Sequence, residues 1–285
     1  MFLVTGATGN VGKAVLAELA NLSVPVRAFV RDPARLAVSA PNIEVFRGDF
    51  NDDDSLQRAF AGVEAAFLAS AFSPRMAELH LRCVKAAKAA GVSRIVQLSG
   101  VGANTEYCCA RALRWLGRVE STTESAGISV THLRPTFFMQ NLLRFATSIA
   151  QQGVIAGPFR AGKWTFVDAR DVGAVGAKAL LDPSHAGRTY TVTGSETLTY
   201  YEVAEQFSEI LGKPIKYADI TANEARGRLQ ATGIPPVMIE ATLEMWDACA
   251  SKLINVAPTQ VVKEVTGRDP RSLADFIREN QAAFK

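Results

Sequence analysis

The sequence predicts an α/β fold, in which a doubly wound parallel sheet is joined to a smaller, mostly helical C-terminal lobe. Three observations support this prediction. Short apolar runs alternate with longer amphipathic segments through roughly the first half of the 285-residue chain. Almost every residue within a run is apolar, and a glycine-rich turn follows the first run. Strands that are apolar on both faces are typical of parallel sheets covered by helices on each side.

The alternation gives the elements of the first half in order. Strands are expected at residues 2–5, 24–30, 43–46, 65–69, 94–98 and 128–133. Helices are expected at residues 10–22, 33–39, from 54 onward, 74–90 and 110–125. Pro33 suits the first position of a helix, and Gly91 suits the position that follows the last helical residue.

The pattern changes after about residue 151. A strand at 164–167, a helix at 169–181 and a strand at 190–192 are still expected, but the sequence beyond Ser195 is mostly helical and is interrupted by prolines. We therefore expect residues 1–150 to form the first domain, with residues 164–193 returning to it. Residues 194–285 are expected to form the smaller lobe.

Composition and charge exclude several classes of protein. With 48% hydrophobic residues the chain is not intrinsically disordered, and its net charge of +3 comes without a basic block, so no nucleic-acid partner is expected. The longest apolar stretch, 65–72, is too short to span a membrane, and no signal segment is expected from the first residues. Its cysteines and histidines lack metal-ligand spacing. We expect a cytoplasmic monomer or homodimer with reduced thiols and no metal or membrane partner.

Three glycines, Gly6, Gly9 and Gly12, follow the first strand and open the first helix with the spacing GxxGxxG. Glycine lets the backbone turn tightly and approach a pyrophosphate, and the N-terminus of the helix offers free N–H groups to the anion. The strand–turn–helix context favours a dinucleotide site over a purely structural glycine loop. A Rossmann-type domain is therefore predicted, with the pyrophosphate held by Gly6, Thr8, Gly9, Asn10 and Val11.

The end of the second strand indicates which dinucleotide binds. Arg31 stands where a guanidinium can pair with a 2′-phosphate, which favours NADP as cofactor, with NADPH preferred and NADH possible. In the alternative interpretation, Arg31 is a solvated loop residue and Asp32 caps the helix that begins at Pro33. After the third strand, Asp49 can accept a hydrogen bond from the adenine amino group, with Phe50 beside the ring.

Small residues at other strand ends leave room for the cofactor to lie across the sheet. The carboxyl ends of parallel strands share one edge, so residues that follow different strands can contact the same ligand. We predict cofactor contacts for Ala69, Ser70 and Ala71 after the fourth strand, Ser99 after the fifth and Pro135 after the sixth.

Together these motifs resemble the atypical short-chain dehydrogenase/reductases, in particular the NmrA-like group, which includes triphenylmethane reductases, NAD(P)H-dependent quinone reductases and azoreductases. The resemblance covers nearly the whole chain. It rests on TGATGNVG at 5–12, VRD at 30–32, GDF at 48–50, LRP at 133–135, FVDARDV at 166–172 and RSLADF at 271–276. It implies a nicotinamide-dependent reductase without flavin, or a sensor that binds the dinucleotide and does no chemistry.

The resemblance is weaker at the catalytic residues. Typical members of the wider superfamily activate the substrate oxygen with a serine, a tyrosine and the lysine of a YxxxK motif. Ser99 matches the serine and Tyr107 is the candidate tyrosine, but Arg111 replaces the lysine and cannot carry a proton as lysine can. In the NmrA-like group a basic residue often lies four positions before a glutamate. If Glu120 is that glutamate, Leu116 occupies the basic position.

Hydride transfer does not require a protein acid. Quinones, azo dyes and carbocations accept hydride at an electron-poor atom and can take their proton from water, so the protein mainly supplies an apolar site that positions them. Packing between the lobes is the alternative role for each candidate wall residue. The expected walls are Phe72, Tyr107, Phe137, Phe138, Met139 and Trp164.

Two hypotheses of different classes follow. The leading one is an NAD(P)H-dependent reductase that transfers hydride directly to a small conjugated or aromatic acceptor, with the smaller lobe binding this substrate. The alternative is a non-catalytic dinucleotide sensor that regulates a partner protein. A sugar-nucleotide epimerase is disfavoured because it needs the Tyr/Lys pair that this sequence lacks.

Overall fold

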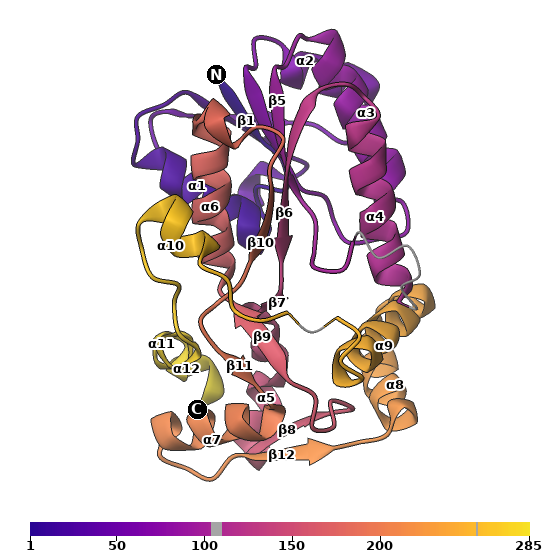
Figure 1. Cartoon of the computed structure of the whole chain (residues 1–285), viewed down its shortest axis with the longest axis vertical. Coiled ribbons are helices and arrows are strands. Elements are labelled where there is room, and N and C mark those ends of the chain that lie inside the picture. Colours follow the sequence, from indigo (N-terminus) through magenta and orange to yellow (C-terminus); the bar gives the residue numbers. More distant parts are fainter. Residues whose placement is uncertain (104–109, 255) are drawn as a thin grey trace.

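A computed structural model describes residues 1–103, 110–254 and 256–285 (Figure 1). Its centre is a seven-stranded sheet in which all neighbouring strands are parallel. This arrangement confirms the predicted doubly wound α/β fold. In sheet order the strands are β10 (Thr189–Val192), β6 (Ser129–Pro135), β5 (Arg94–Leu98), β4 (Ala65–Leu68), β1 (Phe2–Val4), β2 (Val26–Val30) and β3 (Ile43–Arg47).

Helices cover both faces of this sheet, which explains why its apolar runs are continuous. In β1, Val4 packs with α1 and α6, whereas Leu3 packs with α2 and α3 on the other face. Figure 1 shows α1 and α6 on one side and α3 and α4 on the other. The helices are α1 (Asn10–Ala20), α2 (Asp53–Phe60), α3 (Met76–Ala89), α4 (Arg111–Glu124) and α6 (Ala169–Leu181).

The strand order reverses between β1 and β4. The connections from these two strands leave toward opposite faces of the sheet, and such a switch point opens a crevice at the carboxyl ends of the strands. This edge of the sheet faces the second part of the molecule, which lies below it in Figure 1.

The second part contains two small sheets, in which β9 pairs with β7 and β11, and β8 pairs with β12. Of residues 164–193, α6 and β10 lie with the large sheet, whereas β9 lies in a small one. The strands are β7 (Phe137–Phe138), β8 (Val154–Gly157), β9 (Trp164–Val167), β11 (Thr197–Leu198) and β12 (Lys216–Asp219). The helices are α5 (Ala146–Gln152), α7 (Tyr200–Leu211), α8 (Ala222–Ala231), α9 (Pro236–Ala250), α11 (Leu273–Glu279) and α12 (Gln281–Phe284), while α10 (Val261–Thr266) packs on α6.

Two expected elements differ from the structure. The helix expected at 33–39 is only a 3₁₀ turn, Pro33–Arg35, after which Leu36 is already extended. The strand expected at 128–133 continues to Pro135, because β10, a strand far away in sequence, pairs with its last residues. The first difference follows from a segment too short for a stable apolar face, and the second from a tertiary partner that local sequence does not show.

The motifs FVDARDV and RSLADF meet at the start of α6. Asp168 is fully buried and caps the helix, accepting a hydrogen bond from the backbone N of Arg170 at 2.8 Å. Asp171, also buried, accepts from the backbone N of Arg271 at 2.8 Å and pairs with its guanidinium. Both carboxylates are therefore used to cap α6 and to hold the C-terminal segment against it.

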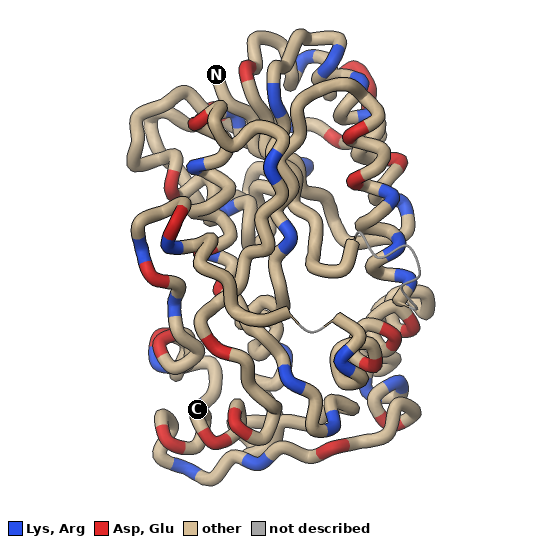
Figure 2. The backbone as a smooth tube through the Cα atoms, in the orientation of Figure 1, with Lys and Arg blue, Asp and Glu red and all other residues tan. Residues whose placement is uncertain are grey.

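Charged residues of both signs are interspersed along the outer helices and loops (Figure 2). None of the helices in the described ranges is both long enough and apolar enough to cross a membrane.

Candidate active site

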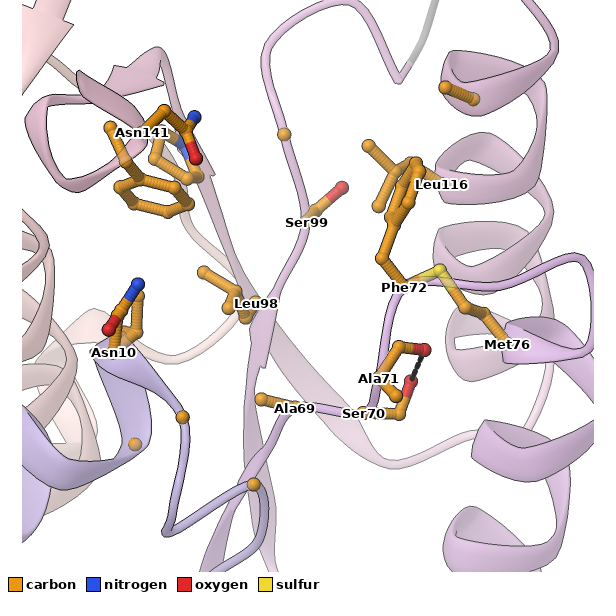
Figure 3. A pocket seen from close by; sticks show the side chains of 18 of the residues that line it. Asn10, Ala69, Ser70, Ala71, Phe72, Met76, Leu98, Ser99, Leu116 and Asn141 are labelled. Carbon is orange, nitrogen blue, oxygen red and sulfur yellow. Dashed lines mark hydrogen bonds between the residues drawn. The ribbon is translucent and has the colours of Figure 1, made fainter. Parts of the chain in front are cut away.

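A cavity of about 810 Å³ opens at the carboxyl ends of the parallel strands. Its walls come from the large sheet and from the second part of the chain. Figure 3 shows its centre, where Asn10, Ala69 and Ser99 come from three different strand–helix connections. All the residues predicted to hold the cofactor line it: Gly6, Thr8, Gly9, Asn10, Val11, Arg31, Asp49, Phe50, Ala69, Ser70, Ala71, Ser99 and Pro135.

The glycine turn is shaped by close backbone contacts. Gly6 has φ +60°, and a Cβ on Gly12 would lie 2.2 Å from the Gly6 carbonyl oxygen, so the turn itself requires both glycines. Gly9 is extended, with φ −85°, and its Cβ would approach protein atoms no closer than 3.2 Å. No side chain caps α1, which leaves its first N–H groups available to an anion.

Two arginines line the cavity beyond β2. Arg31 and Arg35 are both exposed, and Arg35 is a second guanidinium that sequence reasoning did not single out. Asp32 caps the 3₁₀ turn by accepting a hydrogen bond from the backbone N of Ala34 at 3.1 Å, as the alternative interpretation stated. With Asp32 used as a cap, this end of the cavity suits a phosphate better than a ribose hydroxyl.

Asp49 and Phe50 form the adjoining wall after β3. Asp49 Oδ1 accepts hydrogen bonds from the backbone N and from Nδ2 of Asn51, both at 2.8 Å, and the backbone hydrogen bond is the main reason that its pKa is lowered. The Phe50 ring stacks on Phe29 with centroids 5.6 Å apart. A fixed carboxylate beside a flat apolar ring suits an amino-bearing aromatic base such as adenine.

In the middle of the cavity, Ser99 directly follows β5 and points its hydroxyl toward Leu116 of α4 (Figure 3). Glu120, one turn further along α4, is 4% exposed and binds Arg134 of β6 in bidentate fashion, with Nε–Oε1 and Nη2–Oε2 distances of 2.9 and 2.6 Å. Burial raises the pKa of Glu120, but the two hydrogen bonds from Arg134 and the charge of its guanidinium leave the pKa lowered overall. Leu116 is apolar and Glu120 is ionised, so neither offers a proton to the cavity.

Arg111, which replaces the lysine of the YxxxK motif, is not among the cavity residues. It begins α4, where its backbone N and its Nε bind the carboxylate of Glu244 on α9, each at 2.8 Å. The hydrogen bond to Glu244 raises the pKa of Arg111. This arginine therefore ties α4 to α9. Tyr107, the candidate catalytic tyrosine, lies outside the residues that the structure describes.

Aromatic side chains line the far end of the cavity, and Phe72, Phe137, Phe138 and Trp164 are among them. Phe72 is 42% exposed, and its ring packs on Trp115 with centroids 5.6 Å apart. Phe137 meets Trp164 edge-on, with centroids 4.4 Å apart, and Trp164 is buried. We call this aromatic end the acceptor compartment.

Met139 does not line the cavity, although it was a candidate wall residue. It begins the 3₁₀ helix η2 (Met139–Phe145) directly after β7, and its side chain is 2% exposed in the core shared with Phe166. The side chain of a residue just after a strand can pack in the core or face the cavity, and the sequence pattern does not distinguish these two positions.

The rest of the acceptor compartment comes from residues that sequence reasoning missed. Tyr200 begins α7 and stacks on Phe159 at a centroid distance of 3.8 Å, and both line the cavity. No local pattern marks these positions, because only the folded chain brings η2, α7 and α9 together. The other members are Arg144, Phe145, Phe166, Met238, Thr242, Met245 and Trp246.

Known proteins share this architecture. A NAD(P)H azoreductase of Xenophilus azovorans is 34% identical over 285 residues, which are 100% of this chain and 99% of that protein. A (4-alkanoyl-5-oxo-2,5-dihydrofuran-3-yl)methyl phosphate reductase of Streptomyces griseus is 36% identical over 285 residues, with the same coverage.

An NADPH-dependent quinone oxidoreductase of Escherichia coli, solved in complex with NADPH, superposes with a TM-score of 0.88 and 26% identity. The superposition covers 98% of this chain and 99% of that one. The model of the NmrA-like family matches residues 1–276. The chain therefore belongs to the NmrA-like family.

Proposed function

We propose that the protein is an NAD(P)H-dependent reductase that transfers hydride directly, without flavin, to a small conjugated or aromatic acceptor of the quinone, azo or triphenylmethane dye type. One observation carries the proposal: a single cavity runs from the glycine turn of a Rossmann-type sheet to an aromatic compartment. The activities named for similar proteins, azoreductase and quinone oxidoreductase, support it. We propose that the protein acts in the cytoplasm as a monomer or homodimer.

The residues of the first half of the cavity fit NADPH. The uncapped N-terminus of α1 and the absence of a side chain at Gly9 suit the pyrophosphate, and Arg31 with Arg35 suits a 2′-phosphate. Ala69 leaves space at the end of β4. When bound, NADPH would supply a hydride, which is two electrons and one proton. A quinone or azo acceptor would then take its second proton from water, whereas a triphenylmethane cation needs none.

The acceptor compartment would orient the substrate and exclude water. Thr136 Oγ1 and Trp164 Nε1 both belong to buried cavity residues, and neither has a hydrogen-bond partner in the described structure. Buried polar groups are normally paired, so these two atoms suit a carbonyl oxygen or an azo nitrogen of the acceptor. We propose Thr136 and Trp164 as hydrogen-bonding contacts, and Phe72, Phe137 and Phe138 as apolar walls.

The proposal is tested by following NADPH oxidation with a panel of quinones, azo dyes, triphenylmethane dyes and enones. The expected result is turnover of at least one class, without added flavin. Tight NADPH binding with no oxidation by any acceptor would instead support the non-catalytic sensor, which the engaged Arg111 and the apolar Leu116 also favour.

Cofactor choice is expected to depend on Arg31. Arg31→Ala should weaken NADPH binding by roughly 1–3 kcal/mol more than NADH binding, because a charged hydrogen bond to the 2′-phosphate is lost. Dissociation constants for both dinucleotides, measured by fluorescence titration, provide the check. Arg47→Ala is the matched control, since Arg47 is exposed at the end of β3 and does not line the cavity. Equal losses for NADPH and NADH would reject this role.

Tyr107 is expected to contribute little to the rate. Tyr107→Phe should leave kcat nearly unchanged with a quinone acceptor, because Arg111 is bound to Glu244 and no lysine is present to assist the phenol. General acid catalysis is worth ~10²–10⁴ in rate, so a fall of a hundredfold with intact NADPH binding would restore a Ser99–Tyr107 mechanism. Steady-state kinetics at saturating NADPH distinguishes the two outcomes.

A further inference from the structure

The acceptor compartment also borders a charged residue, Arg144. Four charged residues line the whole cavity within the described ranges, and three of them, Arg31, Arg35 and Asp49, lie where the adenosine end of the cofactor is proposed. The fourth, Arg144, comes from η2 and borders the compartment formed by Tyr200 and aromatic residues of β7, β9 and α9.

Arg144 has no carboxylate partner among the described residues. Its guanidinium carbon lies 5.6 Å from the centroid of the Trp246 ring, which gives a cation–π contact but no neutralisation of charge. Its side chain borders the cavity, and part of the residue remains exposed, so that part is available to a ligand. Two other arginines that lie against packed parts of the described structure are paired, Arg134 with Glu120 and Arg111 with Glu244.

The surroundings of Arg144 disfavour its charge. Burial among the neighbouring side chains lowers the pKa of Arg144, although a guanidinium remains protonated at neutral pH. The nearby Tyr200 is no counter-ion, because burial raises the pKa of its phenol and keeps it neutral. A cation held in an aromatic compartment without a partner gains stability when an anion arrives.

We propose that Arg144 binds an anionic substituent of the acceptor, a carboxylate, sulfonate or phosphate, and so makes the enzyme selective for negatively charged aromatic or conjugated substrates. This inference rests on the proposed function, because it assigns the substrate class of the same site. The planar guanidinium can bind two oxygens of such a group at once. The aromatic walls then hold the electron-poor ring system.

The kinetic test compares a neutral naphthoquinone with the same quinone bearing a sulfonate. Arg144→Gln should lower kcat/KM for the sulfonated quinone by roughly tenfold to a hundredfold, as expected for loss of a charged hydrogen bond. The value of kcat/KM for the neutral quinone should stay within about twofold of wild type. Arg144→Lys should recover part of the loss, because it keeps the charge without the bidentate geometry. Arg118→Gln is the matched control, since Arg118 is exposed on α4 away from the cavity.

A binding test keeps this inference separate from the proposed function. Calorimetric titration of naphthalene sulfonate into the protein–NADP⁺ complex requires no turnover, and Arg144→Gln should weaken this binding while Arg118→Gln should not. The inference is overturned if the wild-type complex does not bind the sulfonate, or if Arg144→Gln affects both quinones equally. It is also overturned if Arg144→Gln weakens NADPH binding itself, which would make Arg144 a cofactor contact. Absence of turnover with intact, Arg144-dependent sulfonate binding would reject the reductase and keep the anion site.

Discussion

Gly9→Val is expected to abolish measurable binding of both NADPH and NADH while the protein still folds. Gly9 is extended, at φ −85° and ψ 169°, a conformation that valine readily adopts. A Cβ there would have its nearest protein contact at 3.2 Å, which a small shift of the turn relieves. The branched side chain would instead fill the space in front of the α1 N-terminus, where the pyrophosphate is proposed to lie. We expect an affinity loss of at least about a hundredfold, or ~2.7 kcal/mol.

Gly12→Ala provides the contrasting variant. Its Cβ would lie 2.2 Å from the Gly6 carbonyl oxygen, so the turn between β1 and α1 has to distort and thermal stability should fall as well. Dinucleotide titration together with thermal denaturation separates the two glycines. Unchanged affinity in folded Gly9→Val protein would show that the cofactor binds elsewhere.

The half of the cavity that is proposed to bind the cofactor could be predicted from the sequence because its signals are local. Each predicted contact follows a strand within a few residues, and parallel strands bring their carboxyl ends to one edge. Gly6 and Gly12 are needed for the shape of the turn, while Arg31 and Asp49 simply continue from β2 and β3. Arg35 was missed, since the helix expected at 33–39 does not indicate which of its side chains face the cavity.

The acceptor compartment could be predicted only in part. Phe137 and Phe138 lie close to a strand end and do line the cavity, but Met139, the next residue, turns into the core. Tyr200 and Trp246 reach the cavity from α7 and α9. Their positions depend on how the second part of the chain packs against the carboxyl edge of the large sheet. The spacing of residues within α7 or α9 does not indicate this packing.

For Glu120, the sequence indicated its place on the helix after the fifth strand but not the residue with which it pairs. The family resemblance predicts a basic residue four positions before Glu120, where this chain has Leu116. The structure pairs Glu120 instead with Arg134 of the LRP motif, on the neighbouring strand β6. Pairing across elements depends on the register of α4 against the sheet, and the side chains of α4 alone cannot reveal it.

Glu120→Ala is expected to lower the free energy of unfolding by about 3–5 kcal/mol, because it leaves the Arg134 guanidinium without its partner in a site that is largely closed to water. The Glu120 side chain is 6% exposed and that of Arg134 is 18% exposed. Glu78→Ala is the matched control. It removes the exposed Arg75–Glu78 pair, whose side chains are 56% and 52% exposed, and should leave the free energy of unfolding nearly unchanged. Urea denaturation at neutral pH measures both.

The pH dependence of the same variant distinguishes loss of an ionised pair from loss of packing. The pKa of Glu120 in the folded protein lies below its ordinary value of 4.5, so its contribution is fully present above that pH and is lost as the pH falls through the lowered pKa. The difference in free energy of unfolding between wild type and Glu120→Ala should therefore narrow as the pH falls below 4.5. Replacing both partners, Glu120→Leu with Arg134→Met, should recover much of the loss, because no unpaired charge remains buried. A gap that stays constant with pH, or a double variant as unstable as Glu120→Ala, would mean that the ion pair is not the source of the stability and that α4 is held against β6 by its apolar contacts alone.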